Sequence, residues 1–407
     1  MLKSPTMGSI LMSSIDPAAA ASKPTERFRV EWLDGVRACA ALFVVLHHSY
    51  LMVFPGFPVN NGAPGLGFVM YGHLAVVVFI VVSGFSLGLA PTRRRNDLKH
   101  GSLTFYHRRA WRILPPYWMA LILALLMHWF LLPAAGLPVE AQPPNFRSLF
   151  VFGLLLQDIV PAPTPNGAFW SIAVEAHIYI FFPLMIVLSQ RFSPKAMVAC
   201  SVAILVSAQL LATTGPPFDR LDHLSLALYV AFTFGVWAAS EVSQPTQNLP
   251  MLWIGAALAA ALAVTLWANG VVFLLIHSFW VDVAAGLVVA ILFVGLIQTP
   301  CAFGRFLSLW PISKLGSFAY SLYLTHNLVL PFVIGWLWIG PFYNPYLSYF
   351  SAIAVAVPAT ILFAYLFFLL FERPFLTIRS WAQLRQALGL ARKSRKLSPN
   401  PLAGASD

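Results

Sequence analysis

The sequence predicts an all-α integral membrane protein with about ten transmembrane helices. Hydrophobic residues make up 59% of the 407 positions and charged residues only 10%, and the mean hydropathy is +0.77. Soluble domains carry roughly 25% charged residues, so a chain with this little charge cannot cover a water-exposed surface. The 13 tryptophans and 12 tyrosines suit the two bilayer interfaces, where amphipathic aromatic rings gather. Lipid, rather than water, is therefore expected to surround most of the protein.

Ten apolar segments are long enough to cross a bilayer, which takes about 20 helical residues. They cover residues 36–54, 68–90, 114–132, 169–189, 196–213, 225–240, 250–268, 275–297, 317–339 and 347–371. A further apolar stretch, 146–156, is too short to span and is expected to lie at the interface or to pack on the bundle. The spans predict one transmembrane domain over residues 31–375, preceded by a flexible stretch (1–30) and followed by a basic, partly disordered tail (376–407).

The lysines and arginines are distributed unequally between the predicted loops. In a ten-span arrangement 23 of the 25 fall on one side of the membrane, and only Arg147 and Arg220 fall on the other. Positive residues accumulate on the cytoplasmic side, so both termini are predicted to be cytoplasmic, in a bacterial-type cytoplasmic membrane. Topology thus explains the net charge of +11 without nucleic-acid binding. The three cysteines are far apart and lack the spacing of a zinc site, so no metal is expected.

The first span carries Arg37, His47 and His48, and ionisable groups inside spans are candidates for function because they are costly there. Arg37 and His48 are eleven positions apart, close to three helical turns, so they share one face about 16 Å apart along the axis. An imidazole near the middle of the membrane can take a proton from a hydroxyl and return it. His47 points about 100° away and cannot share this role. A purely structural, hydrogen-bonding histidine is the alternative.

A second polar group, Phe105–Tyr117, leads into the third span and contains Arg108, Arg109 and Arg112. Arg108 and Arg112 are four positions apart and lie on one face of a helix. Guanidinium groups bind phosphate through paired hydrogen bonds, so this spacing predicts a cytoplasmic ligand with several phosphates. Positive charge that merely fixes the topology is the alternative interpretation.

A third polar group opens the fourth span, where Glu175 and Tyr179 are four positions apart and follow Trp170 and Ser171 by one turn. A carboxyl group inside an apolar helix needs a partner. Glu175 could orient a histidine, hold an acceptor hydroxyl, or pair with Arg147 at the interface. Four further polar residues in or beside spans have no distinctive spacing and are interpreted as structural: His73, His277, Asp282 and His326.

Six segments, in this order along the chain, resemble the signature of the membrane acyltransferase-3 family of multi-span O-acyltransferases. They are Leu33–Arg37, Val82–Phe85, Phe105–Tyr117, Trp170–Tyr179, Leu315–His326 and Glu372–Pro374. The ten residues between Arg37 and His48 also match the family pattern. Two departures are the additional His47 and the pair Phe318-Ala319 within the fifth segment.

The resemblance implies a ten-helix bundle whose donor is an acyl-CoA, most often acetyl-CoA, approaching from the cytoplasm. The acceptor would be a hydroxyl of a carbohydrate such as an exopolysaccharide, of a glycolipid or of a polyketide-type molecule. Arg37, His48 and Glu175 would be catalytic. Arg108, Arg109 and Arg112 would bind the donor, and Trp170, Ser171 and Tyr179 the substrate. The short remainder after the last span implies the stand-alone type, without the C-terminal hydrolase-like domain of many members.

Two other functions stay open at this point. Proton-coupled transporters of small solutes or glycans also bury His, Glu and Asp residues within their spans. The sequence has no duplicated halves and no paired broken helices, which disfavours a transporter. A protein that binds a lipid-linked glycan without chemistry is the other alternative, and acyl-CoA turnover separates all three.

Overall fold

The computed structural model describes residues 30–54, 56–58, 65–93, 101–136, 142–216, 224–243, 250–338 and 345–387. Every regular element within these ranges is a helix, as the composition predicted. The predicted flexible N-terminus, Arg220 and most of the predicted disordered tail lie outside the described residues, so those expectations stay untested.

Seven helical stretches are long and apolar enough to cross a membrane, and each contains most of a predicted span. They are α1 (Glu31–Val53), α3 (Gly101–Leu126, continued by a π-helical turn at Met127–Leu131 and by α4, Leu132–Ala134), α6 (Trp170–Arg191), α7 (Pro194–Ala212), α9 (Met251–Ile276), α10 (Ser278–Gln298) and α14 (Pro345–Phe367, continued by a π-helical turn at Phe368–Glu372 and by α15, Arg373–Thr377). The protein is therefore an integral, multi-pass membrane protein.

The other three predicted spans also form helices, in less regular ways. α12 (Trp310–Gly316) and α13 (Ala319–Trp338) meet at 74° and together make an eighth candidate span. The apolar parts of α2 (His73–Arg93) and α8 (Leu226–Ser243) are shorter than a full span. Each of the ten predicted segments thus contains a helix, while ten crossings and cytoplasmic termini stay predictions.

The apolar stretch that was predicted to be too short to span forms α5 (Phe146–Gly153). Asn145 caps it by accepting a hydrogen bond from the backbone N–H of Ser148 at 3.2 Å. The hydroxyl of Tyr117 on α3 donates to the carbonyl of Phe152 at 2.9 Å. This contact confirms that the stretch packs on the bundle.

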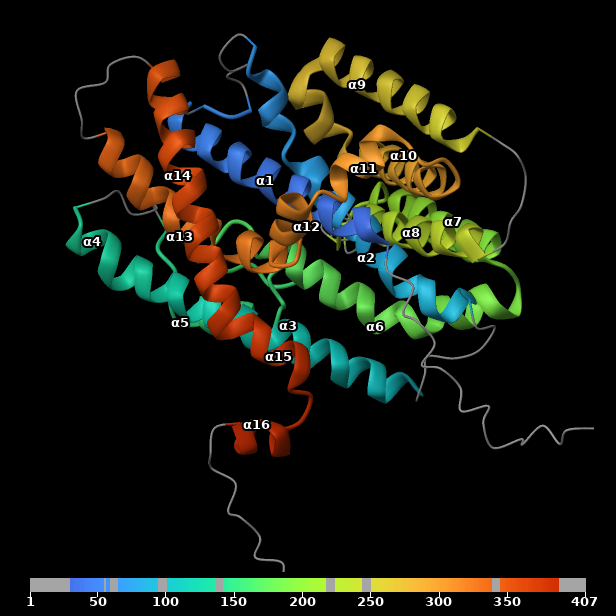
Figure 1. Ribbon diagram of the computed structural model, residues 1–407, viewed down its shortest axis with the longest axis horizontal. Coiled ribbons are helices and arrows are strands. Elements are labelled where there is room, and N and C mark those ends of the chain that lie inside the picture. The colour runs from blue at the N-terminus through green and yellow to red at the C-terminus, as the bar shows by residue number, and fades with distance from the viewer. Residues whose placement is uncertain are drawn as a thin grey trace, which may run out of the picture.

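Glycines let the backbones of helices near the site approach closely. A Cβ on Gly84 of α2 would lie 2.1 Å from the carbonyl oxygen of Phe232 on α8, so only glycine permits this contact. A Cβ on Gly316 of α12 would lie 1.7 Å from the carbonyl oxygen of Asp34 on α1. The first contact joins α2 to α8 and the second joins α12 to α1, and α1 packs against α2, α12 and α13 (Figure 1). The remaining short helices are η2 (Gly67–Tyr71), α11 (Ala302–Leu307) and α16 (Trp381–Ala387).

Candidate active site

A cavity of about 550 Å³ lies between α1, α2, α3, α6, α12, α13 and the segment that follows α14. Charged groups dominate the polar part of its lining. Five arginines line it, Arg37, Arg108, Arg109, Arg112 and Arg379, together with three acids, Asp34, Glu175 and Glu372. A volume of this size is typical of sites for small molecules and cofactors, and its excess positive charge favours an anion.

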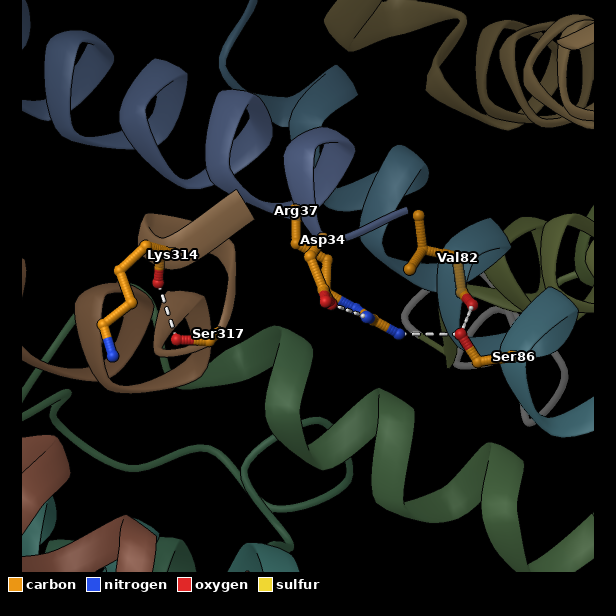
Figure 2. Close-up of polar contacts among 6 residues, drawn as sticks. All are labelled: Asp34, Arg37, Val82, Ser86, Lys314 and Ser317. Carbon is orange, nitrogen blue, oxygen red and sulfur yellow. Dashed lines mark hydrogen bonds and ion pairs between the residues drawn. The ribbon is translucent and has the colours of Figure 1, made fainter. Parts of the chain in front are cut away.

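Arg37 is fixed at the wall of this cavity by two short hydrogen bonds. Its guanidinium donates to Oδ1 of Asp34 and to Oγ of Ser86 on α2, both at 2.7 Å. Figure 2 shows that the Ser86 hydroxyl in turn donates to the carbonyl of Val82, at 2.6 Å. Charge-assisted hydrogen bonds of this kind are strong and directional. Arg37 therefore ties α1 to α2 and faces the cavity with a fixed orientation.

The three arginines of α3 all line the cavity, as their spacing predicted, but they differ in environment. Arg109 is half-buried and lies over the rings of Phe105 (5.8 Å) and Tyr179 (5.9 Å), in cation–π geometry. Arg108 and Arg112 are exposed and form no hydrogen bond or ion pair with any other described residue. These two guanidinium groups are free to bind an anionic ligand.

Glu175 is held by the hydroxyl groups of two neighbouring side chains. It accepts hydrogen bonds from Ser83 at 2.8 Å and from Tyr179, and the hydroxyls of Ser83 and Tyr179 lie 2.5 Å apart. Neither a histidine nor Arg147 is among its hydrogen-bond partners in the described chain, so those two expectations are not met. The three side chains instead form one polar cluster between α2 and α6, on the cavity wall.

Of the predicted substrate-binding residues, Ser171 and Tyr179 line the cavity and Trp170 does not. The Trp170 ring stacks on His73, with centroids 5.7 Å apart, and His73 Nε2 lies 2.9 Å from Oδ1 of Asp282. Ser171, turned by about 100° along the helix, lines the cavity, whereas Trp170 points to His73. Trp170 therefore belongs to a separate polar cluster. In the described part of the chain, no three His, Cys, Asp or Glu residues converge to hold a metal ion.

His48 does not line the cavity. It contacts His326, which follows the cavity-lining Tyr323 by one helical turn. His48 Nδ1 lies 3.0 Å from the carbonyl oxygen of Val44 and 3.3 Å from Nε2 of His326 on α13. The other ring nitrogen of His326, Nδ1, lies 2.7 Å from the carbonyl oxygen of Tyr323. A carbonyl only accepts, so each neutral ring carries its proton on Nδ1. His48 Nε2 is then unprotonated and can act as a base.

His326 and Tyr323 connect this histidine pair to the cavity. Tyr323 lines the cavity, and its hydroxyl lies 2.7 Å from that of Ser171. His326 is fully buried, one helical turn further along α13. The sequence interpretation treated His326 as structural and missed its contact with His48. The available signal was its position at the end of the matched segment Leu315–His326.

His47 has a different environment, as its helical position predicted. Its Nδ1 lies 2.9 Å from the carbonyl oxygen of Val69, and its ring meets that of His48 edge-on at 5.1 Å. A Cβ on Gly72 would lie 2.2 Å from the His47 ring. His47 therefore packs against η2 and Gly72, just before α2.

Comparison with known proteins identifies relatives of this chain. A family model described as "Acyltransferase domain" matches residues 30–369. O-acetyltransferase OatA of Staphylococcus aureus (strain NCTC 8325 / PS 47) is 24% identical over 325 residues, which cover 74% of this chain and 50% of that protein. The putative peptidoglycan O-acetyltransferase YrhL of Bacillus subtilis (strain 168) is 24% identical over 333 residues, or 73% and 48% of the two chains.

Nodulation protein 10 of Rhizobium leguminosarum bv. viciae is 23% identical over 339 residues, which cover 75% of this chain and 84% of that protein. The chain spans about half the length of the first two relatives. No solved structure matches it significantly.

Proposed function

Since the chain belongs to the acyltransferase family whose domain model it matches over residues 30–369, we propose that it is a membrane O-acyltransferase. It moves an acyl group, in the simplest case acetyl, from acyl-CoA to a hydroxyl of a carbohydrate, glycolipid or polyketide-type acceptor. Two relatives named O-acetyltransferases support the reaction type. The observation that carries the proposal is that one helix, α1, presents Arg37 to an arginine-lined cavity and His48 three turns further on.

The arginine-lined cavity receives the donor. Coenzyme A carries several phosphates, and the guanidinium groups of Arg108 and Arg112 form no ion pair with the described residues. Arg37 lies deeper and is already oriented by Asp34 and Ser86, so it faces the arm that carries the thioester. The arm passes Ser171 and Tyr323, which lead towards His326 and His48.

His48 supplies the base. Its unprotonated Nε2 takes the proton of the acceptor hydroxyl as the oxygen attacks the thioester carbonyl. The C–S bond then breaks, the coenzyme A thiolate leaves, and His48 returns the proton to the sulfur. His48 carries a positive charge between these two proton transfers, and its Nδ1–H is then stabilised by His326 Nε2 and the Val44 carbonyl.

Glu175 acts from the cavity wall. Its carboxylate accepts hydrogen bonds from Ser83 and Tyr179, so the two hydroxyls keep one orientation beside the path of the acyl group. Tyr179 also lies under the Arg109 guanidinium. Glu175 therefore couples the donor-binding arginines of α3 to the polar wall formed by α2 and α6.

The proposed function is tested by incubating the detergent-purified protein with acetyl-CoA and measuring free coenzyme A thiol, with and without a mixture of hydroxyl-bearing glycans. We expect thiol release that rises when an acceptor is present. The absence of release with every acceptor, together with solute uptake into vesicles that depends on a pH gradient, would replace the enzyme with a proton-coupled transporter.

A further inference from the structure

The segment after α14 packs against the helix that carries the donor-binding arginines. The Trp111 ring of α3 stacks on Phe375, with centroids 6.1 Å apart and planes at 21°, and it meets Trp381 edge-on at 5.1 Å. Figure 1 shows α15 running beside α3, with α16 below it. Two aromatic contacts to one buried tryptophan thus fix the position of both short helices. Most of this segment lies beyond residue 369, where the match to the family model ends.

Arg379 lies in the connection between α15 and α16, and this connection has a defined conformation. The backbone N–H of Arg379 donates to Oε1 of Gln383 at 2.7 Å, and the N–H of Gln383 donates to Oγ of Ser380 at 3.2 Å. The Arg379 side chain is exposed and lines the cavity together with Arg108 and Arg112 of α3. A segment distant in sequence therefore adds a guanidinium group to the same cavity.

The acids of the cavity form no ion pair with these three arginines, although Glu372 interacts electrostatically with Arg112. Asp34 binds Arg37, and Glu175 accepts from hydroxyl groups. Glu372 is buried and accepts from the backbone N–H and the hydroxyl of Ser321 at 3.2 and 2.6 Å. Among the described residues, Arg108, Arg112 and Arg379 are thus left without an ion pair. Three guanidinium groups around one space repel one another, and a ligand with several phosphate groups relieves that repulsion.

We propose that Arg379 is a third phosphate-binding arginine, which the C-terminal segment adds to the donor site formed by Arg108 and Arg112. This inference rests on the proposed function, because it takes the nucleotide part of acyl-CoA as the ligand. A headgroup phosphate of an anionic lipid has the same chemistry, and the experiment distinguishes the two sources. In either case Trp111 positions the segment.

The test compares wild type, Arg379→Ala and the control Arg385→Ala, an exposed arginine of α16 that does not line the cavity. Each is assayed with acetyl-CoA and with acetyl-pantetheine, which has the same thioester but no phosphate. Loss of one charged hydrogen-bonding partner is expected to raise the KM for acetyl-CoA roughly 10-fold in Arg379→Ala. The KM for acetyl-pantetheine and the kcat for both donors should stay at the wild-type values, and Arg385→Ala should match wild type throughout.

Direct titration of coenzyme A into the purified proteins distinguishes a failure of the Arg379 inference from a failure of the proposed function. We expect weaker binding to Arg379→Ala than to wild type and Arg385→Ala, in nanodiscs with or without anionic lipid. An unchanged affinity of Arg379→Ala, alongside wild-type turnover of acetyl-CoA, overturns this inference and leaves the proposed function intact. If Arg379→Ala lowers thermal stability relative to wild type only with anionic lipid, and not with coenzyme A, the arginine binds lipid. That result also overturns the inference. A wild type that neither binds coenzyme A nor releases thiol overturns both.

Discussion

His48 Nδ1 and His326 Nε2 lie 3.3 Å apart, although 278 positions separate the two residues in the chain. The contact joins α1 to α13 in the interior of the bundle. Since His326 Nδ1 is held by the Tyr323 carbonyl, its Nε2 is left to accept the proton of His48 Nδ1. His326 therefore acts with the Val44 carbonyl to keep the His48 proton on Nδ1 and leave Nε2 free to act as a base, and it is a positioning residue in the proposed reaction.

Replacing His326 tests this relationship. His326→Ala removes the acceptor of a buried hydrogen bond that becomes charged during the reaction, so kcat should fall about 10- to 100-fold with little change in KM for acetyl-CoA. His326→Gln supplies a side-chain carbonyl that accepts the same hydrogen bond and should recover much of the rate. Steady-state kinetics of thiol release measures both. Equal losses in the two variants would mean that His326 fills space rather than orients His48.

Arg37 is expected to be irreplaceable by lysine. Its guanidinium reaches Asp34 and Ser86 at once, whereas an ammonium is a single point charge that cannot keep both geometries. Arg37→Lys should lower kcat/KM for acetyl-CoA at least 10-fold, while Ser86→Ala, which keeps the Asp34 pair, should lower it less. Full activity of Arg37→Lys would show that the position needs only positive charge.

Gly316 is expected to tolerate no side chain, because a Cβ there would lie 1.7 Å from a backbone atom of Asp34. Gly316→Ala should push α12 away from α1 and destabilise the fold by about 1–3 kcal/mol, as overpacking does. Thermal unfolding in detergent, followed by size-exclusion chromatography, measures this. Gly304→Ala on α11 is the matched control, since its nearest neighbour is 3.9 Å away. Comparable stability of both variants would contradict the close contact between α1 and α12.

The arrangement of ten spans with cytoplasmic termini predicts the behaviour of reporter fusions. Green fluorescent protein at the C-terminus should fluoresce, because it folds on the cytoplasmic side. Alkaline phosphatase should be active when fused within the loop after α7 and inactive when fused within the loop after α8. The opposite pattern, or an active phosphatase at the C-terminus, would contradict the charge-based topology.

The parts of the site that lie on one helix could be predicted from the sequence, because helical geometry fixes them. The spacing of Arg37 and His48, of Arg108 and Arg112, and the two faces occupied by His47 and His48 follow from 3.6 residues per turn. Seven of the nine predicted site residues line one cavity, to which α1, α3 and α6 each contribute one face.

Contacts between distant segments could not be predicted in this way. His326 and Arg379 reach the site only because α13 and the segment after α14 pack against α1 and α3, and no local period encodes that packing. Hydropathy does not predict the bend between α12 and α13 either, since both helices are apolar. Trp170 was assigned to the substrate site from its motif, and the rotation of α6 places it on His73 instead.

The central claim is that His48 is the base of an acyl-CoA-dependent transfer. Comparing substitutions of the neighbouring residues His47 and His48 tests it most directly. Transfer of labelled acetyl from acetyl-CoA to a glycan acceptor is measured for purified wild type, His48→Ala and His47→Ala, after correction for the amount of folded protein. We predict that His48→Ala loses transfer by a factor on the order of 10² or more while still binding coenzyme A, and that folded His47→Ala retains most of it. Transfer by His48→Ala at the wild-type rate would contradict the account.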